Sequence, residues 1–348
     1  MANRYLFLCP DSRSPSGGIA VIYDAVIALH RACYDVSILH NSPEAGYPHP
    51  SKAPSVVYHH ACRQVFRKYA GRREKLIEAI RMAWERVRGG PASTLNLLPS
   101  DVIVVPEFMA AEAAEAFPTQ KLVIFVQGPF LFLESYQKCI ARGHDIRKRS
   151  RYFIGTCDTC MDQFDLLGIK NCFHLPVSMN PEKFPFQEIK DRLITYMPRR
   201  RPAEAEFIAA ALRERGRIGD YRLEALEGLP IEAIYEKLQQ SRFFISLLRL
   251  EGLGFPAAEA MAAGCITVGY TGLGPREYFT PETGVPVTDD DTVALIHALE
   301  AAVAEYETHP RRLDSLRRHA SAEINRRFSC SVFEAKLFEI WRELDAKI

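Results

Sequence analysis

The sequence contains no uninterrupted apolar run of about 18 residues, the length that a membrane-spanning helix requires. The opening stretch MANRYLFLCP has neither a basic region nor a small-residue cleavage site, so we expect no secretory signal. An excess of one charge is also missing, because a net charge of +1 offers no global attraction for nucleic acid. The nine cysteines, odd in number and scattered, favour reduced thiols over a disulfide framework. We therefore expect a cytoplasmic protein that does not bind nucleic acid.

What the sequence does contain is a regular alternation of short apolar runs and longer segments of helical period. A chain of 348 residues, 47% of them hydrophobic, can bury two separate cores. The alternation predicts parallel βαβ units and so an α/β fold of two Rossmann-like domains. The expected strands are 5–9, 35–40, 101–107, 121–127, 152–157, 193–197, 242–248 and 265–270. The expected helices are 19–33, 203–215, 230–241, 256–263, 291–306 and 331–347.

A stretch rich in proline and charge, residues 175–192, is typical of an interdomain linker. It predicts a first domain over residues 1–178 and a second over residues 179–330. The tail, residues 331–348, has its apolar residues on one helical face, and we expect this helix to pack back on the first domain.

The segment EGLGFPAAE, residues 251–259, places two glutamates around a glycine turn. Gly252, Leu253, Gly254 and Phe255 follow a predicted strand, and Pro256 suits the first turn of the helix expected over residues 256–263. Unpaired N–H groups at such a helix start attract phosphate. Glu251 and Glu259 flank this seat, and a carboxylate can accept two hydrogen bonds from vicinal hydroxyls. The pattern fits a nucleotide sugar, although a loop charge and a solvated helix residue would give the same spacing.

The longer segment LLRLEGLGFPAAEAMAAGCITVGYTGLGPRE resembles the C-terminal signature of GT-B retaining glycosyltransferases of family four, the glycosyl transferases group 1. That signature has two glutamates separated by seven residues, an Ala-Met-Ala-Gly run, a strand and a glycine-rich turn ending in Glu. The resemblance is specific over residues 242–288 and fainter in LPVSMNPEKF and SPSGGIAVI. It implies a GT-B fold, in which two Rossmann-like domains with parallel sheets face each other across a cleft. The first domain would bind the acceptor and the second the nucleotide sugar.

The resemblance also suggests which basic residues would hold the donor diphosphate. Arg199 matches an arginine that follows the first strand of the family's second domain, although Pro198 replaces the usual glycine. No lysine follows at the usual distance, so Arg200 or Arg201 would take that role, and arginine suits bidentate phosphate contacts. A solvated charge run at a strand end is the alternative.

On the side of the first domain, Gly17 and Gly18 occupy the place of the family's glycine pair. They would let backbone N–H groups approach the donor, or they would serve only a steric purpose. The family's histidine that faces the donor sugar is absent, and Gln127 stands at the corresponding strand end. Its amide could form a hydrogen bond with a sugar hydroxyl.

The function implied is retaining, metal-independent transfer of a sugar from a nucleotide-diphosphate sugar to a glycan, lipid-linked or small-molecule acceptor, for example in bacterial surface polysaccharide synthesis. Glu251 and Arg199 would be the catalytic residues, Glu259 would hold the ribose, and Glu277 would be secondary. No cofactor is expected beyond the donor itself. Two alternatives stay open, namely a catalytically silent nucleotide-sugar-binding module or partner of a transferase, and a nucleotide-sugar epimerase.

Two other patterns suggest metal sites but have simpler explanations. The run Asp289–Asp291 imitates an Asp-x-Asp metal motif, yet it precedes a predicted helix, where acidic residues act as caps. Cys157, Cys160, Cys172 and His174 imitate a zinc site, but small buried thiols explain the cysteines equally well.

Two stretches in the first half are basic, residues 63–88 and 138–151. They predict either solvated helix faces or a surface for an anionic partner. The second possibility would place the protein peripherally at the inner face of a membrane.

Overall fold

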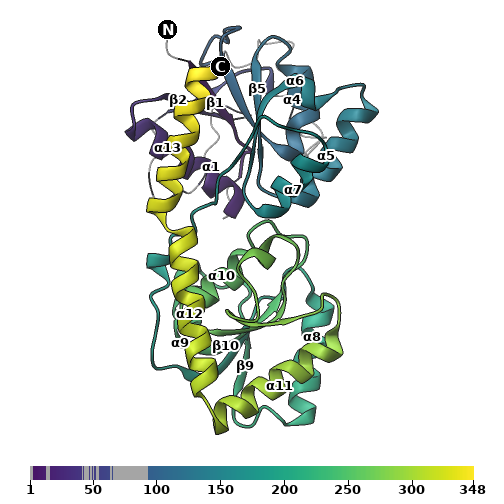
Figure 1. Cartoon of the computed structure of the whole chain (residues 1–348), viewed down its shortest axis with the longest axis vertical. Helices are drawn as coiled ribbons and strands as arrows, with labels where there is room; N and C mark the ends of the chain where they lie inside the picture. The colour runs from purple at the N-terminus through teal and green to yellow at the C-terminus, as the bar shows by residue number, and fades with distance from the viewer. Residues whose placement is uncertain are drawn as a thin grey trace. The chain divides into compact units, whose positions relative to one another are not determined.

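The computed structural model describes residues 3–12, 16–40, 42, 47, 49, 51, 55–62, 65 and 93–348. The chain divides into two compact units (Figure 1). Unit 1 consists of Met1–Gly155, Cys160–Leu175 and Glu334–Ile348, and unit 2 consists of Thr156–Thr159 and Pro176–Phe333.

Unit 1 is built on a sheet whose described strands follow the order β3-β2-β1-β4-β5-β6-β7. All pairings are parallel, and the central strands are buried apolar runs, as expected for a sheet covered on both faces. Because the carboxyl ends of parallel strands share one edge, the loops after β1, β4 and β5 begin next to one another. The strands are β1 (Arg4–Leu8), β2 (Asp35–His40), β3 (Val56–Tyr58), β4 (Val102–Pro106), β5 (Lys121–Val126), β6 (Ser150–Gly155) and β7 (Cys172–His174).

Helices cover both faces of this sheet. Helix α1 buries apolar residues at helical spacing, including Ile22, Val26 and Leu29. In Figure 1, α1 and α13 lie to one side of the sheet, and α4 and α5 lie to the other. The helices are α1 (Gly17–Arg31), α4 (Ala110–Ala116), α5 (Pro129–Ala141), α6 (Ile146–Arg149), most of α7 (Asp158–Leu166) and α13 (Cys330–Lys347) from Glu334 onward.

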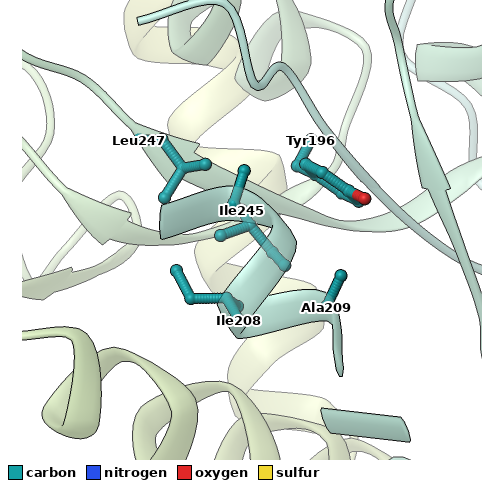
Figure 2. Close-up of a pocket in the computed structure, with 6 residues that line it drawn as sticks. Tyr196, Ile208, Ala209, Ile245 and Leu247 are labelled. Carbon is teal, nitrogen blue, oxygen red and sulfur yellow. The ribbon is translucent and has the colours of Figure 1, made fainter. Parts of the chain in front are cut away.

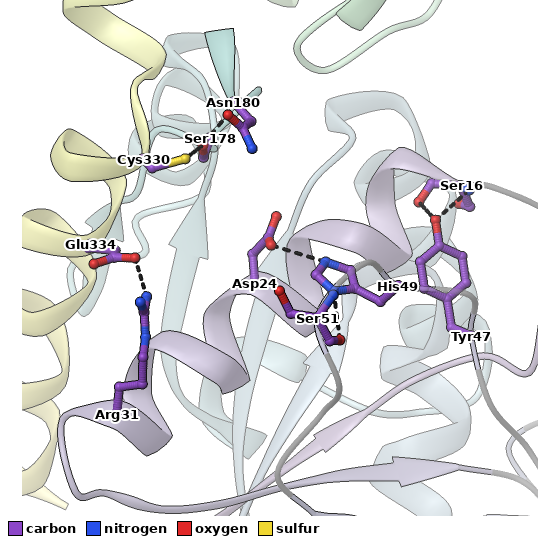
Figure 3. Close-up of polar contacts among 10 residues, drawn as sticks. All are labelled: Ser16, Asp24, Arg31, Tyr47, His49, Ser51, Ser178, Asn180, Cys330 and Glu334. Atoms are coloured by element: carbon purple, nitrogen blue, oxygen red, sulfur yellow. Dashed lines mark hydrogen bonds and ion pairs between the residues drawn. The ribbon is translucent and has the colours of Figure 1, made fainter. Parts of the chain in front are cut away.

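The C-terminal helix α13 packs into the core of unit 1. Trp341 is 1% exposed, and its ring centroid lies 5.4 Å from that of Phe7 in a stacked arrangement. An ion pair between Arg31 and Glu334 joins α1 to α13 (Figure 3). Of the apolar residues predicted to share one face of this helix, only Val332 is exposed.

Unit 2 contains a parallel sheet of described strands in the order β12-β11-β10-β8-β9. Helices α9, α10 and α12 lie on one side of it, and α8 and α11 lie on the other (Figure 1). The strands are β8 (Asp191–Tyr196), β9 (Arg222–Ala225), β10 (Ser241–Leu247), β11 (Ile266–Tyr270) and β12 (Val285–Val287). The helices are α8 (Pro202–Arg215), α9 (Ile231–Gln240), α10 (Phe255–Ala262), α11 (Thr292–Thr308) and α12 (Arg311–Phe328).

A small apolar gap lies between α8 and the sheet of unit 2 (Figure 2). Ile208 and Ala209 of α8 face Ile245 and Leu247 of β10 there, with Tyr196 of β8 beside them. The lining residues belong to the hydrophobic core of the unit. We therefore regard this gap as a packing feature and not as a ligand site.

No helix in the described part of the chain is long and apolar enough to cross a membrane.

Candidate functional site

The glycine turn predicted as a phosphate seat follows β10 and leads into α10. Gly254 is the N-cap of α10, with a left-handed backbone (φ 70°), and Pro256 occupies the first turn. Among the described residues, no hydrogen bond uses the backbone N–H groups of Leu253, Gly254 or Phe255. Such donors at a helix start, with the partial positive charge of the helix behind them, suit an anion.

A second glycine turn, after β11, packs directly against the first. A Cβ atom at Gly274 would lie only 1.7 Å from the carbonyl oxygen of Gly252, so only glycine allows this approach. The buried Tyr278 hydroxyl donates to the carbonyl oxygens of Leu253 at 2.7 Å and Gly254 at 3.1 Å. No sequence motif singled out Tyr278, whose hydroxyl holds the backbone of the turn after β10.

Glu251 lies just before this turn and is paired with one of the predicted arginines. The Nε atom of Arg200 donates to Oε1 of Glu251 at 2.9 Å. Leu250, immediately before Glu251, adopts a left-handed backbone (φ 53°), which is uncommon for a side chain of this size. Arg199 is exposed and forms no ion pair with a described residue.

Arg201, also predicted to contact the donor, is held elsewhere. Its side chain is 7% exposed, and its guanidinium pairs with Glu204 at 2.7 Å and with Asp290 and lies over the ring of Tyr270. The structure therefore brings Arg200 to Glu251 but does not bring Arg201 there. We attribute this to the acidic partners of Arg201, which come from α8 and from the segment before α11.

Glu259 lies about one turn inside α10 and is partly buried. Burial raises the pKa of its carboxyl group to about 7, while Lys183 opposes this shift. Within the described part of the chain, no hydrogen bond to its carboxylate oxygens is present. Burial also raises the pKa of Glu277 to about 7 in the second glycine turn. Glu277 accepts from the N–H of Asp158 at 3.2 Å, whereas Glu259, with no donor among the described residues, is suited to accept hydrogen bonds from a ligand.

The predicted residues of unit 1 also lie together. The sequence predicted that Gly17 and Gly18 lie in the loop before a helix at 19–33. Helix α1 instead begins at Gly17, so both glycines belong to its first turn. A Cβ atom at Gly18 would lie 3.1 Å from Oε1 of Gln127, so this side chain rests on the start of α1. The Tyr47 hydroxyl binds both the backbone N–H and the carbonyl oxygen of Ser16 (Figure 3).

The three aspartates before α11 each have a partner within unit 2. Asp291 caps α11 by accepting from the N–H of Ala294 at 2.9 Å, as predicted. Asp289 accepts from the N–H of Gly272 at 3.0 Å, and Asp290 pairs with Arg201. The capping explanation is confirmed for Asp291, whereas Asp289 binds the glycine turn after β11 and Asp290 binds Arg201.

The predicted cysteine pattern and the two basic stretches lie in unit 1 or at its border with unit 2 in sequence. Cys157 and Cys160 are buried, as expected for small thiols. The basic stretch 63–88 lies outside the described residues, except for Val65. In the stretch 138–151 much of the charge is paired within unit 1, because Arg142 binds Glu112 and Glu115, and Arg147 binds Asp145.

Comparison with known proteins agrees with the C-terminal motif. Residues 222–318 match the family model described as glycosyl transferases group 1. This segment includes Glu251, Glu259 and both glycine turns, so the resemblance seen over residues 242–288 is confirmed. No curated protein matches the chain.

Solved structures resemble the chain over nearly its whole length. Sucrose-phosphate synthase from Thermosynechococcus elongatus has a TM-score of 0.66 and 15% identity, with 99% of this chain and 100% of that chain covered. HepE from Anabaena, in complex with UDP, has a TM-score of 0.64 and 12% identity, with 98% and 100% covered. S. aureus TarM, in complex with fondaparinux, alpha-GlcNAc-glycerol and UDP, has a TM-score of 0.63 and 9% identity, with 99% and 100% covered. At such identities the likeness shows the fold, and the predicted GT-B fold is confirmed.

Proposed function

We propose that this GT-B-fold chain is a retaining, metal-independent glycosyltransferase that uses a nucleotide-diphosphate sugar. The observation that carries the proposal is the set of unpaired N–H groups at Leu253, Gly254 and Phe255, flanked by Glu251 and Glu259. It lies within the segment that matches glycosyl transferases group 1. Two of the similar proteins, HepE and TarM, were solved with UDP, which supports a nucleotide donor.

In this proposal the diphosphate binds the turn of unit 2, and the two acids hold hydroxyl groups on either side. Negative charge accumulates on the diphosphate as the glycosidic bond breaks. Arg199, Arg200 and the N–H groups of the turn would stabilise that charge, which is the role a metal ion has in other transferases. The leaving phosphate would take the proton of the acceptor hydroxyl. The Arg200–Glu251 ion pair would then separate when the donor binds, because each partner is needed by a different part of the ligand.

The first experiment is a thermal-shift panel of UDP, GDP and ADP sugars on the purified chain. A ligand that binds only the folded state raises its stability, so selective stabilisation identifies the donor. Transfer is then measured with that donor and a set of glycan and lipid-linked acceptors, and NMR of the product gives the anomeric configuration. Retention is expected, and inversion would contradict the proposed mechanism.

Glu251→Gln should reduce transfer by about a thousandfold, the scale for losing one electrostatic contact at a reacting centre. The matched control is Glu282→Gln, an exposed acid of unit 2 whose carboxylate accepts from the nearby Thr280 hydroxyl. Near wild-type turnover in Glu251→Gln would contradict the assignment. Donor binding without transfer to any acceptor would instead indicate a silent binding module.

We also propose that the protein is cytoplasmic and contacts an anionic membrane surface when its acceptor is lipid-linked. Leu133 and Ile140 of α5 are exposed, as are Lys148 and Arg151 of unit 1. Binding to anionic vesicles should occur and should weaken with added salt. Binding that is absent or insensitive to salt would remove this part of the proposal.

A further inference from the structure

A buried carboxylate that no sequence motif marks lies at the carboxyl edge of the sheet of unit 1. Glu107 directly follows β4 and is 2% exposed. Its Oε1 accepts from the backbone N–H of Gly128 at 2.9 Å, and its Oε2 accepts from that of Gln127 at 3.2 Å. A buried carboxylate is costly unless it is hydrogen-bonded, and here both oxygens are used.

These two hydrogen bonds fix the turn between β5 and α5. Gly128 is the N-cap of α5 and Pro129 is its first residue, so the Glu107 carboxylate lies at the start of this helix. A negative charge at a helix start occupies the place that a phosphate would otherwise take. The start of α5 is therefore unsuited to a second anion.

The same turn directs a neutral side chain toward the start of α1. In the sheet order, β1, β4 and β5 are neighbours, so the segments that follow them meet at one edge. The Gln127 side chain rests on Gly18, where a Cβ atom would lie 3.1 Å from its Oε1. An amide both donates and accepts hydrogen bonds, which suits a hydroxyl group.

We infer that Glu107 is a positioning residue, which fixes the Gln127–Gly128 turn so that the Gln127 amide, beside Gly18, binds an uncharged hydroxyl group of the substrate. The inference rests on the proposed function. It assigns sugar hydroxyls, and not phosphate, to this edge of unit 1. Burial raises the pKa of Glu107 to about 7 and the two N–H groups lower it, consistent with a carboxylate that needs both bonds when ionised.

The test is a double-mutant cycle on transfer rate with the variants Glu107→Gln, Gln127→Ala and both together. We expect Gln127→Ala to reduce kcat by about tenfold to a hundredfold, the scale for leaving one buried polar group without its hydrogen-bond partner. Glu107→Gln should reduce it similarly, and the double variant should be no slower than the slower single variant. If the two effects multiply, Glu107 does not act through Gln127 and the inference is wrong.

The matched control is Glu112→Gln, because Glu112 is another buried acid of unit 1 and binds Arg142 at 2.7 Å. Its effect on transfer should multiply with that of Gln127→Ala. A purely structural role for Glu107 predicts the same behaviour for both glutamates.

A second measurement does not depend on activity or on a stable variant. Hydrogen exchange in the wild-type protein should be slow at the Gln127 and Gly128 amides, and faster in Glu107→Gln or in the less disruptive Glu107→Asp. Rapid exchange of these two amides in the wild-type protein would overturn the inference. If the wild-type protein transfers no sugar, the proposed function and the role of Gln127 in it are both wrong. Hydrogen exchange at the Gln127 and Gly128 amides then decides whether Glu107 fixes the turn.

Discussion

Replacing Tyr278 with phenylalanine removes one hydroxyl group from beneath the phosphate seat and leaves the ring in place. The hydroxyl is buried and donates to the carbonyl oxygens of Leu253 and Gly254. The ring packs edge-on against Phe328 at 5.5 Å, and phenylalanine keeps this contact. Leaving a buried acceptor unpaired costs about 1–3 kcal/mol. A loss of about 2 kcal/mol lowers the melting temperature of a unit of this size by about 4–8 °C.

The same change should loosen the turn whose N–H groups are proposed to bind the diphosphate. We expect UDP, measured by calorimetric titration, to bind several-fold to about tenfold more weakly, which corresponds to at most about 1.4 kcal/mol. The matched control is Tyr221→Phe, because the Tyr221 hydroxyl donates to Glu307 at 2.9 Å. Tyr221 lies at the amino end of β9, whereas the turn with Leu253 and Gly254 follows the carboxyl end of β10. It should lower stability but leave UDP affinity unchanged. Equal UDP affinities in both variants would refute the argument that Tyr278 supports the seat.

Three further predictions concern unit 2 and its proposed chemistry. Gly254→Ala should destabilise the protein by at least about 1–2 kcal/mol, because its left-handed backbone is costly for alanine and a Cβ atom would lie 2.7 Å from Pro275; an unchanged urea midpoint would contradict this. Burial raises the pKa of Glu259 from 4.5 to about 7, so the folded state keeps a proton that the unfolded state has lost, and the free energy of unfolding should fall as pH rises from about 4.5 to 7. Glu259→Gln should flatten this dependence, and an identical slope in urea unfolding at several pH values would show that Glu259 is not the cause. Transfer should survive dialysis against a chelator, and complete loss that Mg²⁺ restores would refute metal independence.

The central strands and the helices around the motif could be predicted from the sequence. Strand β2 was predicted with its observed bounds, and α8, α10 and α11 within two residues at each end. These elements have long periodic patterns or buried apolar runs, and the residues that cap the helices are adjacent to them in the sequence. All these features can be read from a short stretch of sequence without knowledge of tertiary contacts.

The strands that the prediction missed share one property. Each lies at an edge of its sheet and has only three or four residues, namely β3, β7, β9 and β12. An edge strand has one neighbour instead of two, so it needs no long buried run that would mark it in the sequence. Helix α12 was also missed, although Leu313, Leu316, Ala320 and Ile324 are buried at helical spacing. Its many arginines obscured that pattern.

The candidate site was predictable where its residues are close in sequence. The turn and its two glutamates follow one another within nine residues, so their proximity is guaranteed by the chain. The contacts of Tyr278 with Leu253 and of Glu107 with Gly128 join residues more than twenty positions apart. The separation of Arg200 from Arg201 likewise depends on acids from other segments. Only the folded arrangement reveals these partners.

Helix α13 also determines the order in which the protein can fold during synthesis. The ring of Trp341 packs against that of Phe7, although Trp341 is synthesised long after Phe7. Unit 2 is complete as soon as Phe333 has left the ribosome, whereas unit 1 also needs Glu334–Ile348. A nascent chain that stops at Phe333 would therefore carry a finished second unit and an unfinished first one, whose exposed apolar surface chaperones would recognise.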